Sequence, residues 1–280
     1  MADTKIASDG LPALVIKQHS LEKLFYFQRY IYQFTTALKS KFEERNYIDL
    51  FSGTGLCLVR ETNEEANGSA LLALTTVAPF SNYYFIDLYQ EHLTSLESRA
   101  NAVASAQFLR KLFFQGDCNK KVYDVLKHIN KKYSVNLAIL DGFGIECHWS
   151  TIESLSSCQR MDLIILFPQG MNINRNLKFW VESESNSLDL FFGANGWRKI
   201  YEQEHGRANQ CIRPFLDLYQ SNLRKLGYGG ENQVREQLIR SQGGQKLYYL
   251  IFASRNPLGE KFWKQATDKT LGGQRKLKGF

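Results

Sequence analysis

Short apolar runs alternate with amphipathic segments along most of the chain. From Ser20 onward, apolar residues recur at helical spacing in LEKLFYFQRYIYQFTTALKSKF, which predicts a helix within residues 20–45 with Ser20 as its N-cap. Later runs are continuous and apolar, as is typical of parallel strands buried on both faces. These runs are NYIDLF (46–51), YYFID (83–87), LFFQ (112–115), NLAILD (136–141) and DLIILF (162–167). Helical patterns at residues 69–77, 90–106, 120–133 and 149–156 complete an alternating α/β order.

The last part of the chain has a different pattern. Residues 233–240 and KLYYLIFA (246–253) are strand-like, and the intervening Ser-Gln-Gly-Gly-Gln predicts a hairpin. A parallel sheet completed by an antiparallel hairpin is the seven-stranded, Rossmann-like arrangement of class I S-adenosylmethionine (SAM)-dependent methyltransferases. We therefore predict one α/β domain of this class over residues 1–280. Its expected parts are a mobile N-terminus (1–19), an N-terminal helix (20–45), a SAM-binding half (46–168), a helical insertion (169–232), C-terminal strands and a helix (233–267) and a basic tail (268–280).

Composition narrows the class of protein. With 44% apolar and 13% aromatic residues the chain can bury a sizeable core, and no apolar run is long enough for a membrane span. The N-terminus lacks the apolar stretch of a secretory signal. The five cysteines are widely spaced without a C-x-x-C pair, and the histidines lack metal-ligand spacing, which argues against a disulfide framework or a zinc site. We expect a cytoplasmic protein.

Positive charge is concentrated near the C-terminus. Residues 195–280 hold 16 Lys and Arg against 7 Asp and Glu, whereas residues 1–194 hold 19 against 21. This asymmetry predicts a surface that meets an anion, for which DNA or RNA is the usual candidate; a solvated basic surface or an acidic protein partner is the alternative. The candidate contacts are Arg198, Lys199, Arg224, Lys225, Arg235 and Arg240, with Arg275, Lys276 and Lys278 as an arm. Arg175 is a further candidate for holding a phosphate or carboxylate.

The segment Asp49-Leu50-Phe51-Ser52-Gly53-Thr54-Gly55 is the first candidate for chemistry. An acid at a strand end followed by a Gly-x-Gly turn builds a ligand crevice at the carboxyl edge of a sheet. The third glycine of the dinucleotide pattern is missing, since residue 58 is Leu, so pyrophosphate binding is the weaker interpretation. The alternative is a tight turn whose glycines are structural.

Three further acids follow successive predicted strands. Asp87 is placed to accept hydrogen bonds from ribose hydroxyls, and Asp117 from an adenine amino group; either residue could instead cap the helix that follows. Asp141 opens Asp-Gly-Phe-Gly, where an acid could accept a proton or hydrogen bond from a target amine and Phe143 could stack on a planar substrate. Acids after four consecutive strands make a stronger joint signal than any one of them.

The chain resembles the three-Cys-motif partner (TcmP) proteins along most of its length. The resemblance runs through YIDLFSGTG, GSALLAL, YYFID, GDCN, ILDGFG, HWSTIESL, DLIILFP, LDLFFGANGW and LYYLIFASRNPLG. It implies a SAM-dependent methyltransferase fold, a SAM pocket at Asp49, Gly53, Gly55, Asp87 and Asp117, and a link to a radical-SAM protein with three clustered cysteines. The family pattern has Asp-Pro-Phe-Gly where this chain has Gly142, which predicts a looser turn beside Asp141.

Two functions follow from these observations. The first is a SAM-dependent methyltransferase in which Asp141 and Phe143 act at the acceptor, and Asp49, Phe51, Ser52, Gly53, Gly55, Asp87 and Asp117 bind the cofactor. The acceptor is open, with nucleic acid as a candidate. The second is a non-catalytic or regulatory partner of a radical-SAM three-Cys-motif protein.

Overall fold

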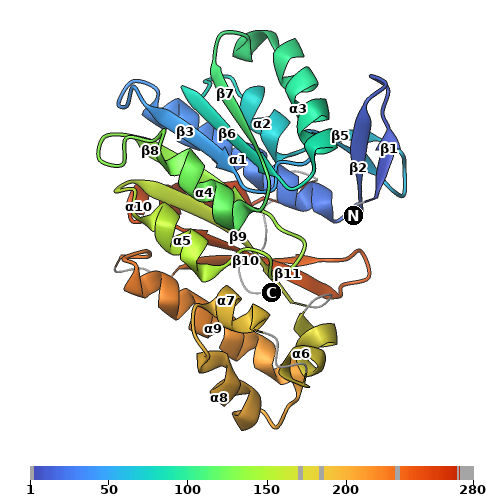
Figure 1. The fold of residues 1–280 in the computed structure, drawn as a ribbon, viewed down its shortest axis with the longest axis vertical. Coiled ribbons are helices and arrows are strands. Elements are labelled where there is room, and N and C mark those ends of the chain that lie inside the picture. Colours follow the sequence, from blue (N-terminus) through green and yellow to red (C-terminus); the bar gives the residue numbers. More distant parts are fainter. Residues whose placement is uncertain (1–2, 170–172, 183–185, 231–233, 270, 272–280) are drawn as a thin grey trace.

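A seven-stranded sheet forms the centre of the molecule, with the strand order β10-β11-β9-β8-β3-β6-β7 (Figure 1). The computed structural model describes residues 3–169, 173–182, 186–230, 234–269 and 271. In the order given, the strands are Arg235–Arg240, Lys246–Ala253, Met161–Pro168, Val135–Leu140, Arg45–Asp49, Asn82–Asp87 and Arg110–Gln115. The sheet is parallel except for β11, which runs antiparallel to both β9 and β10. This is the class I methyltransferase-like, Rossmann-like order, so the predicted fold class is confirmed.

Helices cover both faces of this sheet, as the continuous apolar strands predict. Along β9, Leu163 and Ile165 face one apolar cluster while Ile164 faces the other, because successive strand residues point to opposite faces. One face packs against α1 (Ser20–Leu38), α2 (Ser69–Leu74), α3 (Gln90–Ala102) and α10 (Pro257–Thr267). The other packs against α4 (Cys118–Leu126), α5 (Trp149–Ser156), α6 (Ile173–Glu182), α7 (Ser187–Phe192), α8 (Gly196–Gln203) and α9 (Ala208–Lys225).

The helices α6 to α9 lie within the predicted helical insertion, between β9 and β10, and form the lower part of the molecule in Figure 1. They close one side of the core through aromatic packing. Tyr219 of α9 meets Trp149 of α5 edge-on at 5.3 Å between ring centroids and packs on Phe167 of β9. Gly193 ends α7 with a φ of +76°, and a Cβ there would lie 2.3 Å from the Trp149 ring. Only glycine allows this close approach.

A second, four-stranded sheet corrects two expectations. Residues 1–19, predicted to be mobile, contain β1 (Thr4–Ile6) and β2 (Pro12–Ile16). Residues 56–67, for which no strand was predicted, contain β4 (Leu56–Val59) and β5 (Glu65–Asn67). These strands pair in the order β1-β2-β4-β5. Each is three to five residues long and pairs with a distant segment, so the local pattern did not reveal them.

The predicted N-cap of α1 was also wrong. His19 is the N-cap position, so Ser20 is the first helical residue instead of the cap. The basic arm with Arg275, Lys276 and Lys278 lies outside the described residues. Within the described ranges, no helix combines the length and apolar character needed to cross a membrane.

Arg99 of α3 ties the second sheet to the main domain. Its guanidinium donates to both carboxylate oxygens of Asp9, at 2.7 and 2.9 Å, and to the carbonyl oxygens of Pro12 and Thr54. The side chain of Arg99 is almost fully buried. The contact also holds the pKa of Asp9 below its ordinary value, chiefly through the hydrogen bonds from Arg99. One buried cation therefore anchors the loop between β1 and β2.

Arg99→Met should lower the free energy of unfolding by about 2–3 kcal/mol, because hydrogen bonds from a charged donor are lost and the carbonyl oxygens stay buried. The matched control is Arg60→Met, which removes an exposed ion pair to Asp3 in the same sheet and should change stability by less than about 0.5 kcal/mol. Urea unfolding measures both variants. Equal effects would show that Arg99 does not anchor the sheet.

Candidate functional site

The turn after β3 has a conformation that requires glycine. Gly53 and Gly55 have φ values of +57° and +81°, in the left-handed region that residues with a Cβ avoid. A Cβ on Gly53 would also lie 2.5 Å from Leu14 Cδ1 of β2, so the turn packs closely against the second sheet. Ser52 donates its backbone N–H to the carbonyl oxygen of Ile86 at 2.9 Å, which joins the turn to β6. Both glycines therefore have a structural role at this position.

Asp87, the last residue of β6, holds this turn directly. Its Oδ2 accepts from the backbone N–H of Gly53 at 2.9 Å. Its Oδ1 accepts from the backbone N–H of Tyr89 at 3.0 Å and lies 2.9 Å from His92 Nδ1. A carboxylate has about four acceptor positions, so Asp87 keeps roughly one for a ligand. Asp87 therefore supports the start of α3 through Tyr89 and also holds the glycine turn through Gly53.

Asp117 caps α4, as the alternative interpretation predicts. Its Oδ1 accepts from the backbone N–H of Asn119 at 2.9 Å, and the side chain of Asp117 is exposed. The preceding residue, Gly116, donates to the carbonyl oxygen of Asp87 at 2.9 Å. Asp117 therefore lies beside Asp87 at the same edge of the sheet.

Asp141 follows β8 and forms an ion pair that the sequence did not predict. Its Oδ2 lies 2.5 Å from Lys23 Nζ of α1, and both side chains are more than four-fifths buried. Burial opposes the charge on Lys23, but the neighbouring Asp141 carboxylate raises the pKa of the ammonium above its ordinary value. The other oxygen, Oδ1, is buried and has no hydrogen-bond partner among the described residues. An unpaired buried acceptor is costly, which makes Oδ1 a place where a donor group of a ligand would be stabilised.

The loop after Asp141, where Gly142 predicted a looser turn, is held by hydrogen bonds. Gly144 donates its N–H to Glu146 Oε2 at 2.6 Å, and Asn119 of α4 bonds to the Glu146 carbonyl oxygen and to the His148 N–H. A Cβ on Gly142 would lie 3.0 Å from Phe51 Cζ, so the Phe51 ring occupies the space beside the turn. Phe143 is 75% exposed at this edge.

Asp49 is fully buried beneath this edge. Its carboxylate accepts from the Tyr47 hydroxyl at 3.1 Å and from the Phe51 N–H at 3.2 Å, and it also bonds to Ser69. Burial raises the pKa of Asp49 to about 7; its bonds to Ser69 and Phe51 act against that shift, while the charge of Asp141 adds to it. Asp49 therefore serves as a partly protonated support for the turn.

The structure thus brings the predicted residues to one edge of the sheet. Gly53 contacts Asp87, Asp87 contacts Gly116, and Asp141 lies near enough to Asp49 to influence its charge. Sequence reasoning missed Lys23 and His92, which contact Asp141 and Asp87. Neither residue had a signal of its own, because a lysine or histidine in an amphipathic helix usually faces solvent.

Comparisons with known proteins agree with this architecture only distantly. No protein-family model matches the chain, and no curated protein matches it. A SAM-dependent methyltransferase from Geobacter sulfurreducens, in complex with S-adenosyl-L-homocysteine, is 14% identical over 80% of this chain and 89% of that chain, with a TM-score of 0.41. A SAM-dependent methyltransferase from Thiobacillus denitrificans, also with S-adenosyl-L-homocysteine, is 14% identical over 83% of this chain and 97% of that chain, with a TM-score of 0.39. Trm1 from Pyrococcus horikoshii, in complex with SAM, is 10% identical over 92% of this chain and 62% of that chain, with a TM-score of 0.43. Values this low assign no function to the chain, whose fold is defined by its own strand order.

Asp49→Asn should remove a pH dependence of stability. The folded protein keeps the Asp49 proton up to a pKa of about 7, whereas the unfolded chain releases it near 3.8. Stability of the wild type therefore falls as pH rises between these values, by up to about 1.4 kcal/mol per pH unit from this group. The free energy of unfolding of the variant minus that of the wild type should grow from pH 4.5 to pH 7.

Urea unfolding at several pH values measures this difference. Asp124→Asn, at a half-buried site on α4, is the control, because the hydrogen bonds from Lys127 and Lys121 hold the pKa of Asp124 below its ordinary value, opposite to Asp49. A difference that stays constant over the pH range would contradict the burial of a protonated Asp49.

Proposed function

We propose that this chain is a SAM-dependent methyltransferase whose cofactor binds at the carboxyl ends of β3, β6, β7 and β8. The observation that supports the proposal most is the convergence of the four acids and the left-handed glycine turn at one edge of a sheet with this strand order. Open α/β sheets bind ligands at that edge, where the strand order reverses. Here the reversal lies between β3 and β8, beside Asp49 and Asp141.

The side chains at this edge suit SAM. Asp87 keeps an acceptor position for a ribose hydroxyl, and the Asp117 carboxylate is exposed next to it for the adenine amino group. Phe51, Ser52 and Gly53 form the turn after β3, between the ends of β6 and β8. Asp141 Oδ1 is a buried acceptor without a partner in the described part of the chain. When bound, SAM would supply an activated methyl group.

The chemistry left to the protein is orientation and proton transfer. Asp141 would accept a hydrogen bond from the acceptor amine through Oδ1 and take its proton as the new bond to carbon forms. Burial raises the pKa of Asp141, and the Lys23 ammonium, 2.5 Å away, opposes this rise and favours the ionised carboxylate. Phe143, exposed on the adjoining loop, would stack on a planar acceptor. Holding the two reactants in line supplies a large part of the rate in such transfers.

We also propose nucleic acid as the acceptor, on the basis of the basic C-terminal third. Two of its candidate contacts already have acidic partners: Arg198 pairs with Asp189 at 3.3 Å and Arg235 with Glu260 at 3.7 Å. Arg224 and Lys225 lie exposed on α9 and could contact phosphates. A target base would have to lie in a single strand, or be flipped out of a duplex, to reach Asp141.

A second candidate is the regulatory partner of a radical-SAM three-Cys-motif protein, which the resemblance to TcmP proteins suggests. The contact that favours it is the Lys23–Asp141 pair, because Lys23 occupies one of the two oxygens that an acceptor would use. For either function we propose a cytoplasmic location, since all five cysteines are free and buried.

Asp87→Ala should weaken binding of SAM and S-adenosylhomocysteine by about 10- to 150-fold, the effect of losing hydrogen bonds to a charged group. The variant should also melt at a lower temperature, because Gly53 loses its acceptor. Calorimetry below the melting range of both proteins separates the two effects, with one ligand expected per chain. Asp124→Ala is the control, and equal affinity of the Asp87 variant and the wild type would remove Asp87 from the site.

Asp141→Asn should reduce methyl transfer by about 100-fold or more, because an amide cannot take the proton of the acceptor. SAM affinity should stay close to that of the wild type. The assay follows labelled methyl from SAM into total RNA, DNA and protein of a lysate. Asp162→Asn is the matched control, because Asp162 is a buried carboxylate bonded to Tyr30 near the start of β9. No transfer by the wild type, with retained binding to a three-Cys-motif protein, would favour the partner role.

A further inference from the structure

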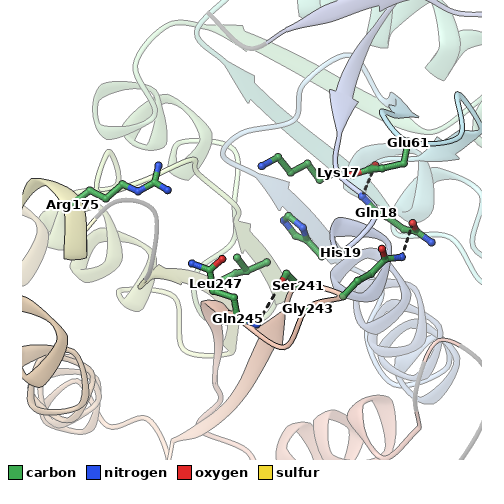
Figure 2. A pocket seen from close by; sticks show the side chains of 10 residues that line it. Lys17, Gln18, His19, Glu61, Arg175, Ser241, Gly243, Gln245 and Leu247 are labelled. Carbon is green, nitrogen blue, oxygen red and sulfur yellow. Dashed lines mark hydrogen bonds between the residues drawn. The ribbon is translucent and has the colours of Figure 1, made fainter.

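A cavity of about 300 Å³ opens between the second sheet, α6 and the β10–β11 hairpin. Residues 17–19 between β2 and α1 form one side, and Ser241–Gln242 with Gln245 and Leu247 of the hairpin form another (Figure 2). Gln242 donates to Gln18 Oε1 at 2.8 Å, which joins these two sides at the rim. The cavity is therefore built from segments far apart in the sequence and is braced across its opening.

Two permanent cations face this cavity. Figure 2 shows Lys17 and Arg175 extending toward it from opposite sides, with the His19 ring between the hairpin and Lys17. Neither Lys17 nor Arg175 forms an ion pair within the described residues. The nearby Glu61 accepts from the Gln18 backbone N–H at 3.0 Å, which holds this carboxylate at the wall. Two cations that form no ion pair within the described ranges, around one polar cavity, indicate a site for an anion.

The cavity adjoins the proposed catalytic edge. The His19 ring packs against Tyr248 of β11 at 6.1 Å between centroids, and Lys23 Nζ lies 5.9 Å from the centroid of the same Tyr248 ring. Lys23 in turn contacts Asp141 at 2.5 Å. The His19 wall of the cavity is therefore connected to Asp141 through the Tyr248 and Lys23 side chains.

We infer that this cavity binds a phosphate group of the methyl acceptor. The inference rests on the proposed methyltransferase function and specifies its substrate as a phosphorylated one. A phosphate matches the lining better than a single carboxylate, because it presents three or more oxygens and up to two charges to Arg175, Lys17 and His19. A volume of about 300 Å³ is at the small end of ligand sites, so the cavity holds one phosphate and part of its sugar.

The surroundings of His19 give this site a pH dependence. Burial lowers the pKa of His19, and the charges of Lys17 and Lys23 lower it further, while Glu61 acts in the opposite direction and Tyr248 packs on the ring. A bound phosphate would raise the pKa of His19, since an anion favours the protonated ring. A phosphodiester, whose single charge does not change in this range, should then bind more tightly as pH falls through the His19 titration.

Binding of uridine 5′-monophosphate, uridine, inorganic phosphate and single-stranded hexauridylate, measured by calorimetry without SAM, tests the inference. The phosphorylated probes should bind and uridine should not. Arg175→Gln and Lys17→Gln should each weaken binding by about 10- to 100-fold, as expected for lost charge-assisted bonds. Lys261→Gln and Lys264→Gln, both at exposed sites on α10, are the matched controls and should bind as the wild type does.

The probes also separate the sources of the phosphate. Tighter binding of hexauridylate than of the mononucleotide, lost in the Arg175 variant, identifies a nucleic-acid strand, and the reverse order identifies a small phosphorylated molecule. Absence of phosphate binding, or equal loss in the control variants, would overturn the inference. Because SAM is omitted, that failure would leave the proposed methyltransferase function standing, whereas failure of SAM to bind would leave the phosphate site standing.

Discussion

The hydrogen bond from the Gly53 N–H to the Asp87 carboxylate is the contact on which the candidate site depends. It connects the ends of two neighbouring parallel strands and sets the direction of the turn between them. The turn can accept this geometry only because Gly53 and Gly55 adopt left-handed φ values. Leu14 of the second sheet then packs against Gly53, so the position of the N-terminal strands depends on the same turn.

Burial and ion pairing determine the charge states of the acids Asp49 and Asp141 at the carboxyl edge. Asp49 lies in the core and is partly protonated near neutral pH, whereas the nearby Asp141 is balanced by Lys23. Two ionised carboxylates without that lysine would repel each other in a region that water reaches poorly. The Lys23–Asp141 ion pair therefore lowers the free-energy cost of a buried, ionised acid at the end of β8. The Oδ1 of Asp141 is buried and has no hydrogen-bond partner among the described residues, so this oxygen keeps acceptor capacity for a ligand donor.

The sequence predicted those helices and strands whose segments have a clear local pattern of apolar and polar residues. The predicted helix 149–156 and strand 246–253 have the same bounds as α5 and β11, because each has a clear period and flanking turn residues. The second sheet was missed, since its short strands gain stability from distant pairing and from Arg99. The strand-end acids were placed on the correct edge because parallel strands share one carboxyl edge. Their partners Lys23 and His92 could not be predicted, since tertiary packing alone brings them there.

A crystal structure of the chain with S-adenosylhomocysteine tests the proposed cofactor site most directly. We predict ligand density at the carboxyl edge, with the ribose beside Asp87, the adenine beside Asp117 and the sulfur facing Asp141. The Gly53–Asp87 bond should be unchanged in the complex. Ligand density at any other place would contradict the proposed site. So would crystals grown with saturating ligand in which this edge is empty and Asp141 is still paired with Lys23.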